Sequence, residues 1–285
     1  MDIINRIDES FDINKTNDYH LSIRVTPDGF SFSVLDLPAQ KYIFLHYEEF
    51  KNPGSDSLIC NELTHAIENN PVLKSSYQSS ALTYASCKST LVPAPLFNEN
   101  EMERFFRFNH EQKNSETINS RFIKIADAYS VFSIPLCIKE IAKNYFKKST
   151  VIHHSPVLIE NILSQNKNRI EGIKVYTHVH ECFFEILVIS REGLILYNCH
   201  RFTNENDFVY HLVNTFEQTR LNADTTEVII SGLMEKASKK HMLLKKYIKK
   251  VHFEELPAKY RYAYSIKELP HHFFISLFNI HSCAL

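Results

Sequence analysis

Three stretches near the start of the chain alternate apolar and polar residues with a period of two. They are residues 19–26, 30–37 and 41–50, and the connectors between them, "TPDG" and "LPAQK", carry turn residues. This pattern predicts three strands joined by tight turns. Apolar residues at helical spacing then predict a helix over residues 60–70, which ends before a proline.

The same order of elements returns after residue 171. Three predicted strands, "GIKVYTHVHE", "CFFEILVIS" and "LILYNCHRF", are followed by the predicted helix "ENDFVYHLVNTFEQT". The short apolar run "TEVIISG" is typical of a buried central strand, and a lysine-rich helix comes next. Each half of the chain is therefore predicted to contain three strands, a helix, a strand and a helix, and then a further strand and helix.

Similarity between the two halves indicates an internal duplication. Residues 30–50 align without a gap with residues 182–202, so that apolar positions face apolar positions along both hairpins. A second segment, "AYSVFSIP" at residues 128–135, is similar to "AYSIKELP" at residues 263–270. Because the two matches occur in the same order within the same series of elements, we expect two copies of one fold.

Three antiparallel strands followed by alternating helices and strands make a ribonuclease-H-like unit, and two such units in tandem make the actin-like architecture. "STLVP" followed by "PLF", the paired "AYS…P" segments and "FFEILVISREGLILYN" resemble a family of uncharacterised Bacteroidetes proteins assigned an actin-like ATPase fold. The resemblance covers nearly the whole chain. It implies an α/β protein with mixed β-sheets, whose ribonuclease-H-like halves we place at residues 1–170 and 171–285. It implies no particular activity.

Glycine is scarce, and this limits the ways in which the chain could bind phosphate. Only five of the 285 residues are glycine, and they are too isolated to form GxGxxG or GxxxxGK[ST]. Such loops need glycine so that backbone amides can approach the phosphates closely. The sequence therefore excludes a Rossmann fold and a P-loop.

Actin-like ATPases carry phosphate-binding turns at the first hairpin of each half and a glycine turn near the adenosine. Asp28 and Gly29 occupy the first position, although the preceding proline removes an amide donor. The gapless alignment places residues 178–181, "HVHE", at the second position. Ser231 and Gly232 follow the fourth predicted strand of the second half, which is the third position. These degenerate loops disfavour ATP as a ligand, and we expect no cofactor and no catalysis. A divergent ATP-binding protein or ATPase stays open as an alternative.

Two histidines are weak candidates for a metal site. His178 and His180 lie two residues apart on a predicted strand, so they share one face of it, and neutral imidazoles suit zinc. We favour a different interpretation, in which both are polar residues on an exposed face and the chain binds no metal. The adjacent pair His153 and His154 is expected at the surface or at the entry to a helix.

The lysine-rich helix is a candidate surface for binding nucleic acid. It carries several lysines. The candidates for contact with nucleic acid are Lys239, Lys240, Lys245, Lys246 and Lys249. Positive charge alone attracts phosphates. The lysines also fit an ordinary solvated helix face with an apolar stripe, which is the interpretation that we favour.

Charge and cysteine content narrow the function only slightly. The formal net charge is −1, the start of the chain lacks a secretory signal pattern, and no apolar run is long enough for a membrane span. The six cysteines are scattered, which favours reduced thiols in a cytoplasmic protein. We therefore expect a non-catalytic actin-like binding or scaffold protein with a protein partner. An RNA- or ribosome-associated protein is an alternative.

Overall fold

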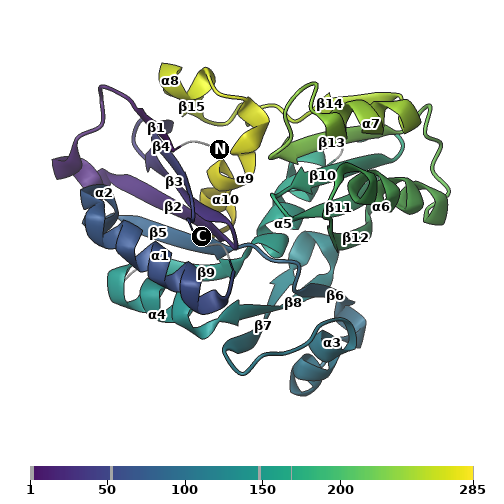
Figure 1. Ribbon diagram of the computed structural model, residues 1–285, viewed down its shortest axis with the longest axis horizontal. Helices are drawn as coiled ribbons and strands as arrows, with labels where there is room; N and C mark the ends of the chain where they lie inside the picture. Colours follow the sequence, from purple (N-terminus) through teal and green to yellow (C-terminus); the bar gives the residue numbers. More distant parts are fainter. Residues whose placement is uncertain (1–2, 52–53, 147–148, 168, 285) are drawn as a thin grey trace.

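The computed structural model describes residues 3–51, 54–146, 149–167 and 169–284. It has two large mixed β-sheets, one in each half, that lie on either side of the molecule (Figure 1). The order of strands in the first sheet is β1-β4-β3-β2-β5-β9, with β15 beside β4. These strands are β1 (Ile4–Ile7), β2 (Tyr19–Thr26), β3 (Gly29–Asp36), β4 (Lys41–Glu49), β5 (Ser79–Tyr84), β9 (Ser149–His153) and β15 (Arg261–Tyr262).

The second sheet repeats the central part of the first. Its order is β12-β11-β10-β13-β14, in which three antiparallel strands are followed by two parallel ones. The matching part of the first sheet is β4-β3-β2-β5-β9, with the same directions. The strands are β10 (Lys174–Val179), β11 (Phe183–Ser190), β12 (Gly193–Arg201), β13 (Glu227–Gly232) and β14 (Lys250–Phe253). The expected duplication of a ribonuclease-H-like unit with a mixed sheet is confirmed.

Helices cover both faces of each sheet and bury its apolar side chains. The helices α1 (Asp56–Asn69), α2 (Pro71–Lys74) and α4 (Leu136–Tyr145) pack on the outer face of the first sheet. The helices α6 (Glu205–Gln218) and α7 (Lys239–Tyr247) do the same on the second sheet. Removing this apolar surface from water contributes about 25 cal/mol per Å² and is the main force that holds each layer together.

The two halves exchange their last elements across the middle of the molecule. Helix α5 (His154–Asn166) follows the first sheet in the chain, but its apolar side packs against β10 and β11 of the second sheet. The helices α8 (Tyr264–Lys267), α9 (Ile275–Phe278) and α10 (Ile280–Ala284) follow the second sheet in the chain. From this segment, α8 and α9 pack against the first sheet (Figure 1). The division at residue 170 stays a prediction, and each half receives an element from the other half's range.

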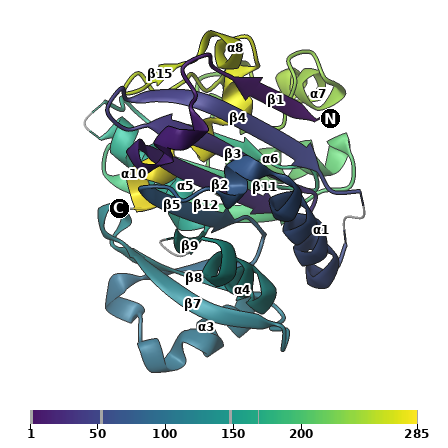
Figure 2. The same ribbon diagram turned by 90° about the vertical axis from the view of Figure 1, so that its left-hand side faces the viewer.

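A small third layer is inserted between β5 and α4. It contains the sheet β6-β8-β7 and the helix α3, and it lies below the first sheet in Figure 2. The elements are β6 (Ser89–Pro93), α3 (Met102–Asn109), β7 (Glu116–Ile123) and β8 (Ala128–Pro135).

The second repeat match is wrong. "AYSVFSIP" is strand β8, which pairs with β6 on one side and β7 on the other, whereas "AYSIKELP" forms helix α8 and the turn after it. The second segment has charged residues, Lys267 and Glu268, where the first alternates Phe132 and Ser133. The two segments therefore do not correspond, and the similarity is local.

The first match pairs the correct strands, but the alignment of their residues needs a gap. Strands β4 and β12 correspond as the gapless alignment has them, since Lys41 and Gly193 begin them. The strands before them, β3 and β11, correspond with a shift of two residues relative to the gapless alignment. The evidence is a bulge that follows Val34 in β3 and Val188 in β11, whereas the gapless alignment pairs Val34 with Ile186. The shift arises because the loop between β3 and β4 is longer than the loop between β11 and β12. A shift of two keeps every side chain on its face, so the alternating pattern hid it.

Four cysteines form two disulfides, which the scattered spacing did not suggest. Cys60 bonds Cys137, and Cys87 bonds Cys199 across the two halves. The two remaining cysteines are Cys182, which is exposed, and Cys283, which is buried. The expectation that the thiols are all reduced is therefore wrong in this structure.

Thiol titration tests these disulfides. In denaturant without reductant, we expect a thiol reagent to modify only Cys182 and Cys283, and to modify all six cysteines after reduction. Each disulfide closes a long loop, so reduction should lower the free energy of unfolding by about 2–4 kcal/mol per bond. Cys182→Ser is the control, which should remove one reactive thiol and leave the melting temperature unchanged. Six reactive thiols before reduction would contradict the structure.

Candidate functional site

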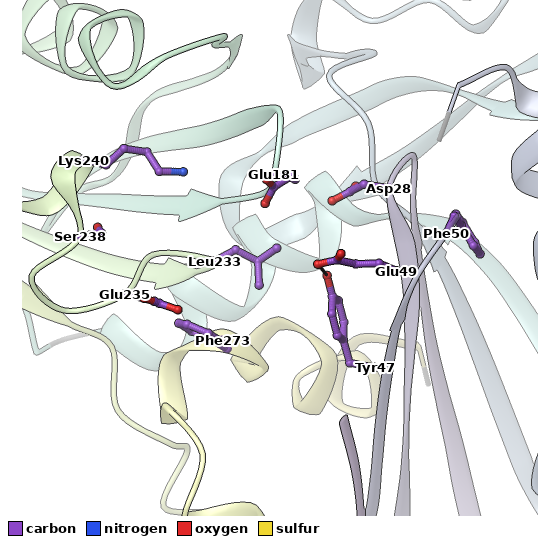
Figure 3. A pocket seen from close by; sticks show the side chains of 10 residues that line it. All are labelled: Asp28, Tyr47, Glu49, Phe50, Glu181, Leu233, Glu235, Ser238, Lys240 and Phe273. Atoms are coloured by element: carbon purple, nitrogen blue, oxygen red, sulfur yellow. Dashed lines mark hydrogen bonds between the residues drawn. The ribbon is translucent and has the colours of Figure 1, made fainter. Parts of the chain in front are cut away.

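A cavity of about 440 Å³ lies between the two halves. Both halves and the C-terminal segment contribute to its wall, and the labelled side chains other than Phe50 surround a common space (Figure 3). The lining residues are Asp28, Tyr47, Glu49, Phe50, Glu181, Leu233, Glu235, Ser238, Lys240 and Phe273. We call this space the cleft.

The first hairpin turn of each half reaches the cleft. Asp28 lies between β2 and β3, where its carbonyl oxygen accepts a hydrogen bond from the Phe50 amide at 2.9 Å. Glu181 lies between β10 and β11, in a turn closed by the His180 amide and the Phe183 carbonyl oxygen at 2.9 Å. The two carboxylates face each other across the cleft in Figure 3. The duplication has thus brought equivalent turns together.

The second turn differs from the one that the gapless alignment indicated. Thr26 pairs with Gly29 at the base of the first turn, and His180 pairs with Phe183 at the base of the second. The equivalent of "TPDG" is therefore "HECF", residues 180–183, and not "HVHE". The corrected turn still contains neither glycine nor a hydroxyl group, so the argument against a phosphate loop holds for the correct residues as well.

Backbone packing explains why glycine occupies both candidate positions, and this explanation involves no ligand. A Cβ atom on Gly29 would lie 2.5 Å from the carbonyl oxygen of Glu48 on the neighbouring strand. Gly232 has φ of +81°, and a Cβ atom there would lie far inside van der Waals contact with the Val179 carbonyl oxygen. Only glycine allows two backbones to approach this closely.

Amides near the third candidate loop are already used within the protein. The Leu233 amide donates to the Val179 carbonyl oxygen at 2.7 Å, and the Met234 amide donates to the Gly232 carbonyl oxygen at 2.9 Å. The Ser231 side chain is buried and lies 2.9 Å from Nδ1 of His178. Of the four predicted nucleotide-loop residues, only Asp28 lines the cleft.

Negative charge dominates the described lining of the cleft. It contains the carboxylates of Asp28, Glu49, Glu181 and Glu235, against the ammonium group of Lys240. Lys240 also lies over the Phe202 ring at 4.7 Å, and Tyr47 donates a hydrogen bond to Glu49 at 3.3 Å. Like charges focused in a concave site repel anions and attract cations.

The carboxylate of Asp28 has a perturbed pKa. Burial raises the pKa of Asp28, and the nearby Glu181 carboxylate raises it further, against lowering contributions from the Thr26 hydroxyl and the Arg24 guanidinium. Among the described residues, its Oδ1 atom is buried without a hydrogen-bond partner. An ionised side chain here is unfavourable for the fold and is typical of a functional position.

The two candidate histidines are buried, so the expectation of an exposed strand face is wrong. His178 and His180 are 1% and 3% exposed, and they pack against His154, which is 0% exposed. Glu185, from β11, forms hydrogen bonds with His154 and His180. His153 is the N-cap of α5, as a helix-entry position predicts, but both members of this pair are buried rather than at the surface. The adjacent pair carried no local signal that His154 would meet His178.

The candidate lysines differ in their surroundings, and their contact with nucleic acid stays a prediction. Lys239, Lys245, Lys246 and Lys249 are exposed on and after α7, but Lys240 turns toward the cleft. Lys249 is paired with Asp224 at 2.9 Å. Leu244 and Ile248 are buried beneath them, which fits a solvated face above an apolar stripe.

Comparison with solved structures identifies the class of fold as actin-like. A protein of Bacteroides thetaiotaomicron VPI-5482, described as having an actin-like ATPase fold and unknown function, superposes with a TM-score of 0.82 at 23% identity. The match covers 96% of this chain and 99% of that one. The type IV pilus biogenesis complex PilM–PilN matches with a TM-score of 0.62 at 8% identity, over 91% of this chain and 96% of that one.

The chain belongs to the family DUF3822, described as a protein of unknown function, whose model matches residues 8–251. The expected family and fold are therefore confirmed. No curated protein matches the chain. Within the part of the chain that the structure describes, no helix combines the length and apolar character needed to cross a bilayer.

Alanine substitutions separate the packing role of Gly232 from a ligand role. Gly232→Ala should lower the free energy of unfolding by about 3 kcal/mol or more, because strain at positive φ and overlap with Val179 add together. Gly172 is the matched control, since its φ is +82° and no described atom lies within 4 Å of the place that a Cβ atom would take. Gly172→Ala should cost only about 1 kcal/mol in urea unfolding. Equal effects would contradict the packing argument.

The raised pKa of Asp28 predicts a stabilising substitution. Between the ordinary pKa of 3.8 and the raised native value, the native state binds more protons than the unfolded state, so stability falls as pH rises through this window. Asp28→Asn should therefore raise the melting temperature at pH 7, and the gain should shrink as pH approaches 4. The exposed Glu217→Gln is the control and should change little. A lower melting temperature for Asp28→Asn at pH 7 would refute this account.

Proposed function

We propose that the chain is a non-catalytic actin-like protein that binds another protein, and that the cleft between its halves receives a basic segment of that partner. The acidic lining of the cleft carries this proposal. A nucleotide would bring its phosphates to the first hairpin turns of the two halves, and these turns place the carboxylates of Asp28 and Glu181 at the cleft. The same carboxylates favour an ammonium or guanidinium group.

The shape of the cleft fits a side chain with an apolar stem and a charged end. Tyr47, Phe50, Leu233 and Phe273 supply apolar surface beside the carboxylates. Lysine and arginine bury their aliphatic stems along such surfaces while the charged end reaches a carboxylate. Aromatic rings add an attraction for the cation itself. A volume of about 440 Å³ accommodates one or two such side chains from a peptide.

The PilM–PilN type IV pilus biogenesis complex contains a chain of this fold, so the fold is known in a protein complex. At 8% identity the similarity concerns the fold alone, and the proposal for this chain rests on its own cleft.

Nucleotide is the first ligand to test. We expect the melting temperature to stay unchanged when ATP and Mg²⁺ are added, because the Leu233 and Met234 amides near the third candidate loop are occupied and the cleft repels anions. Stabilisation by ATP that disappears in Asp28→Ala would overturn the proposal in favour of a divergent ATP-binding protein.

Peptide binding tests the proposal directly. Peptides that contain arginine or lysine beside an aromatic residue should bind, while versions with glutamate in place of the basic residue should not. The double variant Glu181→Gln with Glu235→Gln should weaken binding by up to roughly tenfold, in a salt-dependent manner, because both carboxylates are solvent-accessible. Glu217→Gln, on the far side of α6, is the matched control. Equal binding by the double variant would exclude the cleft as the site.

A further inference from the structure

Three histidines form a compact buried cluster where the two halves meet. His154 begins α5, while His178 lies on β10 and His180 directly follows it. One ring nitrogen from each histidine lies within 4.8 Å of the other two. The ring centres are 4.9 Å apart for His154 and His178, 5.2 Å for His154 and His180, and 4.7 Å for His178 and His180.

Hydrogen bonds orient the rings and determine where their protons lie. Oε2 of Glu185 lies 2.7 Å from Nδ1 of His154 and 3.1 Å from Nε2 of His180. A carboxylate accepts hydrogen bonds, so His154 places its proton on Nδ1 and has a lone pair on Nε2. Tyr197 donates to the other oxygen of Glu185 at 2.8 Å, which holds the carboxylate in place.

Two of the ring nitrogens are buried without a hydrogen-bond partner among the described residues. Among the described residues, Nε2 of His154 and Nε2 of His178 have no hydrogen-bond partner. Nδ1 of His178 lies 2.9 Å from the Ser231 hydroxyl, which leaves Nε2 as its free position. Buried polar atoms without partners are rare in proteins, and a bound ion is one of the ways in which such atoms are satisfied.

Burial keeps two of these imidazoles, those of His178 and His180, neutral. Burial lowers the pKa of His180 to about 4 and that of His178 well below its usual value. Burial alone would raise the pKa of Glu185, but its contacts with His154 and His180 outweigh this and lower it. Glu185 and the buried Arg24 guanidinium are the charged groups that act on the cluster. Neutral imidazole is the form that binds a metal.

We propose that His154, His178 and His180 coordinate one divalent transition-metal ion, with Glu185 as the carboxylate that orients the ligands. Three imidazoles around a tetrahedral ion, at about 2.0–2.1 Å from the metal, place their ring centres about 5 Å apart. The observed ring centres already have this spacing. Small side-chain rotations bring the ligand nitrogens to the ion, and a water molecule completes the tetrahedron.

The arrangement of Glu185 supports this assignment. A histidine that binds a metal through one nitrogen commonly donates its other N–H to a carboxylate, which fixes the ring and strengthens it as a ligand. His154 makes this contact with Glu185. Zinc is the natural probe, because imidazole ligands and tetrahedral geometry suit it.

The position of the site suggests what the ion does. His154 comes from the segment that follows the first sheet, while His178 and His180 belong to the second sheet. A shared ion therefore ties α5 to β10 and holds the two halves in one arrangement. Glu181, which follows His180 in the chain, lines the acidic cleft, whose negative charge attracts cations.

Metal titration of tag-free protein tests the proposal. After removal of metals with a chelator, we expect zinc to bind at about one equivalent per chain by calorimetry and to raise the melting temperature. His154→Gln and His178→Ala should abolish this binding. Glu185→Gln should weaken it about 10–100-fold, as loss of a carboxylate partner does at other sites. His200→Ala is the matched control, because His200 is a half-buried histidine of β12 that stacks on His211 outside the cluster.

A second readout covers the case in which a variant folds poorly. Cobalt(II) bound to the wild-type protein should give the intense visible absorption of a tetrahedral site, and zinc should displace it. Weak absorption typical of octahedral cobalt would overturn the assignment. So would the absence of zinc binding to the wild type, or unchanged binding in a His178→Ala protein that gives a native circular dichroism spectrum.

Discussion

The interface between the two halves depends on the carboxylate of Glu185. It is 1% exposed, and an ionised carboxylate removed from water is strongly unfavourable unless it is fully hydrogen-bonded. Its partners are His154 from α5, His180 after β10 and Tyr197 from β12. These contacts orient α5 against the second sheet, so the exchange of elements between the halves is coupled to the burial of one charge. Removal of one partner would leave that charge uncompensated.

The cleft depends on this interface, because the residues that line the cleft come from both halves. The turns that carry Asp28 and Glu181 face each other only while the sheets keep their relative position. Both turns follow directly from the strands that lead into the interface, β2 and β10. The buried histidines and the acidic cleft are thus neighbouring parts of one polar region, in which the inner part contains imidazoles and the outer part contains carboxylates.

The periodicity of the sequence predicted the fold because strands with one buried face carry their register in their side chains. The hairpin match identifies the correct strands for this reason, and a shift of two residues leaves the alternating pattern unchanged. "AYSVFSIP" and "AYSIKELP" show the limit of such comparisons. Their secondary structure depends on the partner strands: β8 has strands on both sides, whereas α8 has none on either. Local identity carries no information about such partners.

The site was harder to predict because it consists of long-range contacts. His154 meets His178 and Glu185 through the packing of α5, and Cys87 meets Cys199 over a separation of 112 residues. Neither spacing matches a recognisable motif. The sequence therefore predicts an exposed strand face for His178 and reduced thiols for Cys87 and Cys199, and both predictions are wrong. Residues of the cleft such as Glu49 and Glu235 carry no signal in the sequence, since glutamate is ordinary surface composition.

Glycine illustrates why a motif and a function have to be distinguished. Gly232 stands where an actin-like ATPase would place a glycine near its nucleotide, and the sequence alone leaves two reasons for it. The carbonyl oxygen of Val179 decides between them, because it occupies the space that a side chain would need whether or not a nucleotide binds. A duplicated scaffold of this kind retains such glycines for as long as its strands pack, even when the turns around them carry carboxylates. The persistence of the fold is therefore no argument for the persistence of the ATPase, and the charges in the cleft have to be interpreted on their own.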